Sequence, residues 1–170
     1  MTSVVLSIGS NLGDRLAQLQ SVVDGLDGAV RAVSPVYETD PWGGVEQGAF
    51  LNAVVLADDP ALDGRGWLRR AQELEQAAER LRDERWGPRT LDVDLVMCSS
   101  GGREVTSDGE ELTLPHPLAH KRAFVLVPWL AVDPAATLTV AGQRRSVEKL
   151  LAELDPADRD GVRLTDAALS

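Results

Sequence analysis

The sequence predicts an α+β fold in which helices pack on one face of an antiparallel sheet. Short stretches that alternate apolar and polar residues indicate half-buried strands, and two longer stretches repeat their apolar residues every three or four positions, as amphipathic helices do. These stretches follow one another in the order β-α-β-β-α-β. No repeat, low-complexity tract or linker interrupts them, and 170 residues can bury a substantial core. We therefore expect one domain over residues 1–170.

The chain begins with a predicted strand over residues 4–8 and a helix that follows the loop 9–14. The apolar residues of this helix recur at helical spacing: Leu16, Leu19, Val23 and Leu26. A glycine-containing loop between a strand and a helix resembles a phosphate-binding loop, but neither the G-x-G-x-x-G nor the G-x-x-x-x-G-K-[ST] pattern is present. Asp14 as a helix N-cap explains the loop equally well, and we favour this structural interpretation.

Two further strands are expected, around residues 30–37 and over 50–56. The segment 38–48 between them is rich in glycine and helix-breaking residues, so we expect a long loop with a functional role. Phe50 and Asn52 lie on the same face of the strand that follows. A ring for stacking and an amide that both donates and accepts would suit a flat heterocycle. The alternative, a core phenylalanine beside a turn asparagine, is favoured by the spacing alone.

The second half of the chain opens with a long amphipathic helix. Its apolar stripe steps by four and three residues: Trp67, Ala71, Leu74, Ala78 and Leu81. Arginines crowd its C-terminal end and the residues after it: Arg80, Arg82, Arg85 and Arg89. The helix dipole favours cations there. However, the chain as a whole carries a net charge of −10, which makes a local basic cluster more indicative of an anion-binding role.

The most informative stretch runs from Arg85 to Asp94, because it combines guanidiniums and carboxylates around the rigid turn 87–88. The strand that follows places Asp92 and Asp94 on one face, roughly 7 Å apart, and the apolar residues between and beside them on the other. Two such carboxylates repel by roughly 3 kcal/mol at an effective dielectric near 20. A divalent cation reverses this cost, and Mg²⁺ prefers one or two carboxylates together with phosphate oxygens. The alternative is a solvated acidic strand face.

The last part of the chain carries fewer signals. Residues 101–109 predict a polar hairpin or loop, and 112–117 a short extended piece closed by prolines. His116 lies between two prolines and is placed either to donate to a phosphate or simply to face solvent. A buried helix is expected over 123–132, and Arg122 at its start opposes the helix dipole, which slightly favours a ligand role. The polar tail after 133 predicts one weak helix near 147–154.

Composition narrows the classes of function. The net charge of −10 argues against general binding to nucleic acid or anionic membranes, since both need a basic surface. The N-terminus lacks the features of a signal peptide, and no apolar run reaches the length of a membrane span, so we expect a cytoplasmic protein. A single cysteine, Cys98, precludes an intramolecular disulfide and is expected to be half-buried.

Four segments together resemble the 6-hydroxymethyl-7,8-dihydropterin pyrophosphokinase family: 9–13, 50–53, 85–94 and 114–124. The matches run in order from about residue 4 to residue 132, and the tail 133–170 adds little. The resemblance implies a ferredoxin-like α+β fold and an enzyme of folate biosynthesis. Such an enzyme transfers pyrophosphate from ATP to the hydroxymethyl group of a reduced pterin and releases AMP. A monomer is expected, with ATP and the pterin as its partners.

The resemblance also implies roles for individual residues. Two Mg²⁺ ions would bind Asp92 and Asp94. The residues with a catalytic role would be Arg80, Arg89 and His116, and those around ATP would be Gln72, Glu75, Arg82, Thr113, His116 and Arg122. The pterin would lie between Phe50 and Phe124, with its surroundings completed by Thr39, Asp40, Trp42, Asn52 and Trp86. At position 50, where tyrosine is also common in the family, this chain has Phe50. The ring can still stack on the pterin, but the hydroxyl contact is lost.

Overall fold

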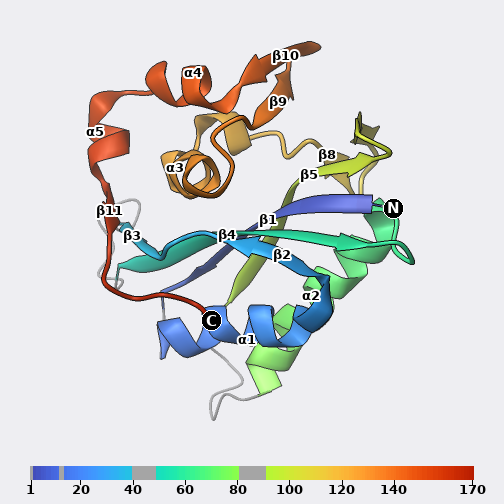
Figure 1. Cartoon of the computed structure of the whole chain (residues 1–170), viewed down its shortest axis with the longest axis vertical. Coiled ribbons are helices and arrows are strands. Elements are labelled where there is room, and N and C mark those ends of the chain that lie inside the picture. The colour runs from blue at the N-terminus through green and yellow to red at the C-terminus, as the bar shows by residue number, and fades with distance from the viewer. Residues whose placement is uncertain (1, 12–13, 40–48, 81–90) are drawn as a thin grey trace.

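The fold is built on an antiparallel sheet whose centre is β1 (Thr2–Ser10), flanked by β4 (Phe50–Asp59) and β5 (Asp92–Ser100) (Figure 1). The computed structural model describes residues 2–11, 14–39, 49–80 and 91–170. Within them the sheet has seven strands in the order β11-β3-β4-β1-β5-β6, and β2 also pairs with β4. The outer strands are β2 (Val30–Val33), β3 (Tyr37–Thr39), β6 (Arg103–Val105) and β11 (Val162–Leu164).

Helices cover both faces of the sheet, which corrects the expectation that they pack on one face. In Figure 1, α1 (Arg15–Leu26) and α2 (Gly64–Arg80) lie on one side, and α3 (Ala123–Val132) and α4 (Val147–Ala152) lie on the other. The physical reason is the composition of α3, which is apolar around its whole circumference and therefore needs cover on every side. A sheet face on one side and the C-terminal part of the chain on the other supply that cover.

Two apolar cores follow from this arrangement. The first core lies between the sheet and α1 and α2, and the second core lies between the sheet and α3. Strand β1 serves both, because its alternating side chains send Leu6 into the first core and Val5 into the second. Cys98 on β5 belongs to the first core and is 0% exposed, so the expected half-buried thiol is in fact fully buried. Burial, with a smaller contribution from the charge of Asp63, raises the pKa of Cys98 to about 11.

Several predicted elements are confirmed. Helix α3 spans Ala123–Val132, as its apolar run predicts, and α2 contains the predicted apolar stripe from Trp67 to Ala78, whereas Leu81 lies outside the described residues. Asp14 is the N-cap of α1, because its Oδ1 accepts the backbone N–H of Ala17 at 3.1 Å. The single strand expected around 30–37 is instead two strands, β2 and β3, that pair with different parts of β4. Pro35 has no N–H for a strand ladder, which explains the break between β2 and β3, and next to the break the Ser34 hydroxyl accepts the N–H of Val54 at 2.8 Å.

The chain after residue 133 is more ordered than its sequence predicts. The weak helix expected near 147–154 is α4, but the hairpin of β9 (Thr137–Val140) and β10 (Gln143–Ser146), the helix α5 (Pro156–Asp160) and the strand β11 were not predicted. The hairpin turns at Ala141 and Gly142 with φ of 52° and 79°, and an Ala-Gly pair is a weak signal for such a turn. The short remaining elements are η1 (Asp27–Ala29), β7 (Ser107–Asp108), β8 (Thr113–Leu114) and η2 (Ala119–Lys121). No described helix is both long and apolar enough to cross a bilayer.

Candidate active site

The candidate site lies at one end of the three central strands. Gly9 of β1 stands opposite Asn52 of β4 on one side and opposite Asp92 of β5 on the other, so these three residues form one row across the sheet. Asp94 lies opposite Ser7, two residues back along β1. Leu91, Val93 and Leu95 are buried in the first core, whereas both aspartates are only partly buried. The predicted separation of carboxylates and apolar side chains onto opposite faces of β5 is therefore confirmed.

Asn52 is the best-defined polar group of the row. Its side chain is buried, and its Nδ2 donates to the hydroxyl of Thr39 at 2.7 Å. Gly9 makes room for it, because a Cβ at position 9 would lie 2.9 Å from the Asn52 Oδ1, closer than real Cβ contacts allow. The predicted loop 9–14, interpreted as structural, includes Gly9, whereas β1 in fact extends to Ser10 and places Gly9 within the strand. The family resemblance includes residues 9–13, but the physical reason for a glycine at position 9 comes from the register of β1 and β4, which no local pattern encodes.

The aromatic and cationic groups of the site come from the first turn of α3 and from β4. Arg122 lies over the ring of Phe124, with its guanidinium carbon 5.6 Å from the ring centroid. Phe124 packs against the second core, on the sheet face to which Val54 contributes. Phe50 and Asn52 share that face of β4, because side chains two residues apart point the same way. The structure thus places the two predicted aromatic residues on the same side of the sheet.

His116 follows β8, and two hydrogen bonds hold it, one made by its backbone N–H and one by its ring. Its N–H donates to the carbonyl of Val96 in β5 at 2.8 Å, and its Nδ1 accepts the N–H of Leu118 at 3.1 Å. Because Nδ1 accepts, a neutral ring carries its proton on Nε2. Burial and the nearby positive charge of Arg122 lower the pKa of His116, and the charge of Asp94 opposes them. His116 is therefore predominantly a neutral N–H donor at neutral pH, within electrostatic reach of Arg122 and Asp94.

Space for a ligand adjoins His116. A cavity of about 320 Å³ is lined by His116 with its flanking prolines, by His120 and by the β9–β10 turn around Val140. The turn belongs to the part of the chain for which the sequence predicted little structure. This cavity is therefore lined partly by a predicted site residue, His116, and partly by the β9–β10 turn, which was not predicted.

Helix α2 reaches the site from the opposite face of the sheet. The Glu75 carboxylate accepts the backbone N–H of Val93 at 3.0 Å, so it is bonded to the peptide between the two aspartates. Gln72 is exposed on the same helix, and Thr113 is exposed on β8. Glu75 thus belongs to the immediate surroundings of the Asp92–Asp94 pair, whereas no described contact joins Gln72 or Thr113 to it.

Part of the predicted site lies outside the described residues. This applies to Asp40 and Trp42, to the arginine segment with Arg82, Arg85 and Arg89, and to Trp86. Arg80 ends α2, but its side chain also lies outside the description.

The donor set at Asp92 and Asp94 fits Mg²⁺. Both side chains offer hard oxygen donors from one strand face, and Mg²⁺ takes one or two carboxylates and completes its octahedron with water and phosphate oxygens. Within the part of the chain that the structure describes, no group of three or more His, Cys, Asp or Glu side chains gathers as a closed metal cage would require. A site of this kind depends on the substrate to complete it.

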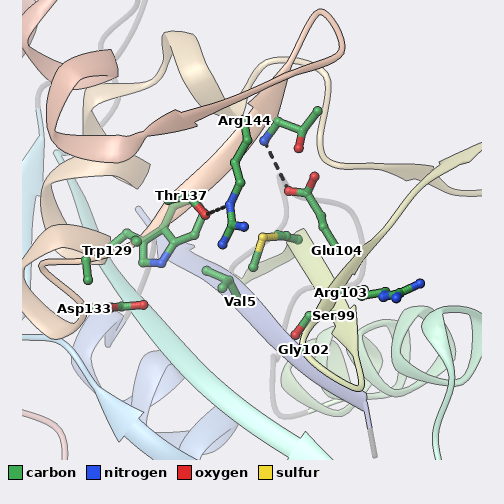
Figure 2. Close-up of a pocket in the computed structure, with 13 residues that line it drawn as sticks. Val5, Ser99, Gly102, Arg103, Glu104, Trp129, Asp133, Thr137 and Arg144 are labelled. Carbon is green, nitrogen blue, oxygen red and sulfur yellow. Dashed lines mark hydrogen bonds between the residues drawn. The ribbon is translucent and has the colours of Figure 1, made fainter.

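A larger cavity, of about 460 Å³, lies away from these residues, at the other end of β1 and β5 (Figure 2). Its walls include Val5, Trp129 and Arg144, and none of the predicted site residues lines it. Hydrogen bonds join some of its lining residues (Figure 2): Arg144 Nε donates to the Thr137 hydroxyl at 3.0 Å, and Glu104 accepts the N–H of Thr139 at 3.2 Å. We therefore place the candidate site by its converging charged groups and not by cavity size.

Comparisons with known proteins point to one family. The family model described as 7,8-dihydro-6-hydroxymethylpterin-pyrophosphokinase matches residues 5–134. Relatives named 2-amino-4-hydroxy-6-hydroxymethyldihydropteridine pyrophosphokinase include proteins of Mycobacterium tuberculosis, 67% identical over 96% of this chain and 90% of the relative, and Mycobacterium leprae, 65% identical over 99% and 92%. A relative from Methylorubrum extorquens is 40% identical over 92% of this chain and 96% of its own.

Solved structures show the same fold. Plasmodium falciparum HPPK-DHPS with SDX-DHP matches with a TM-score of 0.60 at 11% identity. The match covers 90% of this chain but only 43% of that one, so the chain spans less than half of the solved protein's length. At this identity the likeness concerns the fold alone.

Proposed function

Since this chain belongs to the 7,8-dihydro-6-hydroxymethylpterin-pyrophosphokinase family, we propose how its residues carry out the reaction of that family. The enzyme is a transferase of folate biosynthesis that moves a pyrophosphoryl group from ATP to 6-hydroxymethyl-7,8-dihydropterin. The hydroxymethyl oxygen forms a new bond to the β-phosphorus of ATP. The bond from that phosphorus to the oxygen shared with the α-phosphate breaks, AMP leaves with the electron pair, and the hydroxyl proton is released.

The pterin binds beside Asn52, with Phe50 and Phe124 stacking on its ring. Among the described residues, Thr39 is the one partner of the Asn52 amide, through a single N–H, so the second amide hydrogen and Oδ1 remain for the edge of a heterocycle. A pterin presents both donors and acceptors along one edge, which a fixed amide can match. Asp40, Trp42 and Trp86 complete this pocket on the strength of the family resemblance.

Asp92 and Asp94 would hold two Mg²⁺ ions together with the phosphates of ATP, and the ions would supply positive charge that neutralises the transferred group. The protein's part is to keep two like charges on one strand face. Glu75 contributes by bonding the Val93 N–H, because that bond fixes the peptide that joins the two aspartates. Both carboxylates then face the same side in a backbone that is held from α2.

The phosphates are bound by cationic and neutral donors. Arg122 offers a planar, permanently charged fork that suits a phosphate, and His116 donates its Nε2–H to a phosphate oxygen. Keeping His116 neutral leaves Nδ1 engaged with Leu118 and fixes the direction of the Nε2–H. On the resemblance alone, the remaining contacts to ATP come from residues around this pair: Gln72, Glu75, Arg80, Arg82, Arg89 and Thr113.

One observation carries this assignment, namely the row formed by Gly9, Asn52 and Asp92. Neighbouring strands lie about 4.8 Å apart, so the backbones of Asn52 and Asp92 are separated by about 10 Å across β1. A pterin held at Asn52 therefore presents its substituent toward phosphates held at Asp92 and Asp94. Direct transfer between two bound substrates requires pterin recognition and metal binding close together, and this row places them on either side of β1 at one end of the sheet.

The reaction is tested by identifying its nucleotide product. With Mg²⁺, ATP and 6-hydroxymethyl-7,8-dihydropterin, the enzyme releases AMP in amounts equal to the pterin diphosphate formed. Asp94→Ala should abolish this product while the far-ultraviolet circular dichroism stays unchanged. Asp133→Ala serves as the control, since Asp133 lines the distant cavity. Release of ADP would contradict pyrophosphoryl transfer, and full turnover by Asp94→Ala would contradict the metal assignment.

We propose further that residues 1–170 work as a single domain and as a monomer in the cytoplasm, with ATP and the reduced pterin as partners. The net charge of −10 supports the absence of nucleic acid and anionic membrane among them. Light scattering coupled to gel filtration measures the mass in solution. A mass near 18.3 kDa supports the monomer, and twice that mass contradicts it.

A further inference from the structure

One guanidinium connects the middle of β3 to the residue before β4. Arg15, at the start of α1, donates from Nη1 to the carbonyl of Ala49 at 2.6 Å, and the same nitrogen lies 3.5 Å from the Glu38 carboxylate. Glu38 belongs to β3, and Ala49 directly precedes β4. A helix terminus thus joins two strands that both carry residues assigned to the pterin pocket.

A second arginine reaches the same carboxylate from the C-terminal part of the chain. The other oxygen of Glu38 lies 3.4 Å from Nη2 of Arg163 in β11. Strand β11 pairs with β3, with Val162 opposite Thr39 and Leu164 opposite Tyr37. We call Arg15, Glu38 and Arg163 the Glu38 network.

The residues after β11 hold this strand in place. Thr165 donates both its N–H and its hydroxyl to the carbonyl of Val36, at 3.0 and 2.8 Å. Ser170 bonds the Gln20 side chain of α1 through its N–H at 3.0 Å and its carbonyl at 2.6 Å. Figure 1 shows the segment running from α5 along β3 to α1. These contacts come from beyond residue 134, where the match to the family model ends.

Register connects the network to the pocket. Glu38 pairs with Leu51, between the pairs Tyr37–Asn52 and Thr39–Phe50. Side chains alternate along a strand, so Glu38 faces α1 while Thr39 faces Asn52. A shift of β3 by a fraction of an ångström would therefore disturb the 2.7 Å bond that orients the Asn52 amide.

We propose that the Glu38 network is a positioning device for pterin recognition, which holds β3 so that Thr39 fixes the Asn52 amide. This inference rests on the proposed assignment of Asn52 to the pterin. The network's side chains are 33% to 45% exposed, and ion pairs at such positions contribute little to global stability. Its effect is local, because β3 has only three residues, and Glu38 is the middle one, between the residues that pair with Phe50 and Asn52.

The test compares Glu38→Gln and Arg163→Gln with the wild-type chain in steady-state kinetics and in calorimetric pterin binding. Glu38→Gln should raise KM and Kd for the pterin about fivefold to tenfold, the equivalent of losing one oriented hydrogen bond. The kcat and the KM for ATP should change less than about twofold. Arg163→Gln should give a smaller rise, Arg163→Lys should restore most of it, and the Glu38→Gln/Arg163→Gln double variant should match Glu38→Gln alone, because both act on one network.

Arg31→Gln is the matched control. Arg31 forms an ion pair with Asp58 at 2.6 Å between β2 and the far end of β4, so its loss removes a similar interaction at a distance from the pocket. It should lower the melting temperature as much as Glu38→Gln does and leave pterin binding unchanged. A Glu38→Gln variant whose pterin affinity stays at the wild-type value, or whose pterin and ATP constants rise equally, would overturn the inference. Failure of the wild-type chain to form AMP would instead overturn the proposed function.

Discussion

At the scale of single residues, the site depends on groups that are held in one orientation. The hydroxyl of Thr39 orients the Asn52 amide, which fits only because Gly9 has no side chain. The backbone N–H of Leu118 orients the His116 ring. In both cases a neighbouring backbone or hydroxyl group decides which atoms face the ligand. Oriented donors lower the entropic cost of binding, since little freedom remains to be lost.

Gly9→Ala tests the first of these orientations. The added Cβ would meet the Asn52 Oδ1 at 2.9 Å, so the amide must move away from Thr39. We expect pterin affinity to fall by about tenfold or more, because a misoriented polar group costs about 1–3 kcal/mol. Isothermal titration calorimetry measures the effect. Gly28→Ala, where a Cβ meets nothing within 4 Å, should bind normally, and normal binding by Gly9→Ala would argue against the role of Gly9.

His116 predicts a pH dependence. Its folded-state pKa is lowered by burial and by Arg122, below its usual value of 6.5. Its contribution to the free energy of unfolding is therefore complete above pH 6.5 and is lost as the pH falls through the folded pKa. An NMR titration of the ring protons should show a midpoint below 6.5. Arg122→Gln should raise the midpoint for His116 and leave that of His120 unchanged. A His116 midpoint that is the same in the variant and in the wild-type chain would refute the contribution of Arg122.

At the scale of elements, α2 and β5 act as one unit. The helix contributes Trp67, Ala71 and Leu74 to the first core. The carboxylate of Glu75, on the same helix, accepts a hydrogen bond from the backbone of β5. The aspartates therefore lie on a strand whose apolar face is packed in the first core and whose backbone is hydrogen-bonded to Glu75. A metal-binding pair needs this stiffness, because its two carboxylates repel each other whenever the cation is absent.

Glu75→Ala should loosen that unit. Removing the carboxylate leaves the Val93 N–H without its acceptor, which costs about 1–3 kcal/mol in the free energy of unfolding. Denaturant titration measures the loss, and hydrogen exchange at Val93 should accelerate more than at strand positions in β4. Gln76→Ala, an exposed neighbour on the same helix, should change stability by less than about 0.5 kcal/mol. Equal effects of the two substitutions would show that the bond is unimportant.

At the scale of the whole molecule, the C-terminal part of the chain completes the structure on two sides. Leu138 of β9 and the α4 residues Val147 and Leu150 are buried in the second core beneath α3. Strand β11 extends the sheet next to β3. The expectation that the tail adds little applies to its motifs but not to its packing.

Leu138→Ala tests the structural importance of the tail. The side chain is 1% exposed in the second core, so truncation should cost about 2–5 kcal/mol through lost burial and a residual cavity. Urea unfolding of the full chain gives the difference. Leu164→Ala, at a side chain that is 66% exposed, should cost well under about 1 kcal/mol. A small loss for Leu138→Ala would mean that the second core tolerates removal of the hairpin's main anchor.

Local patterns in the sequence determined the parts of this protein that depend on neighbouring residues. Alternation along 91–95 placed Asp92 and Asp94 on one face, the apolar run 123–132 marked α3, and Asp14 marked the start of α1. The motifs identified the family, which the comparisons confirm. Each of these conclusions rests on residues close together in the chain, where periodicity and capping act.

Only the tertiary structure decided what depends on pairing between distant segments. The row of Gly9, Asn52 and Asp92, the helices on both faces of the sheet, and the contact of Arg163 with Glu38 all join residues far apart in the chain. Strand register and the packing of one face against another are set by the sum of many such contacts, and no single segment encodes them. The sequence alone therefore predicts most of the side chains of the site, whereas their positions relative to one another follow from the tertiary structure.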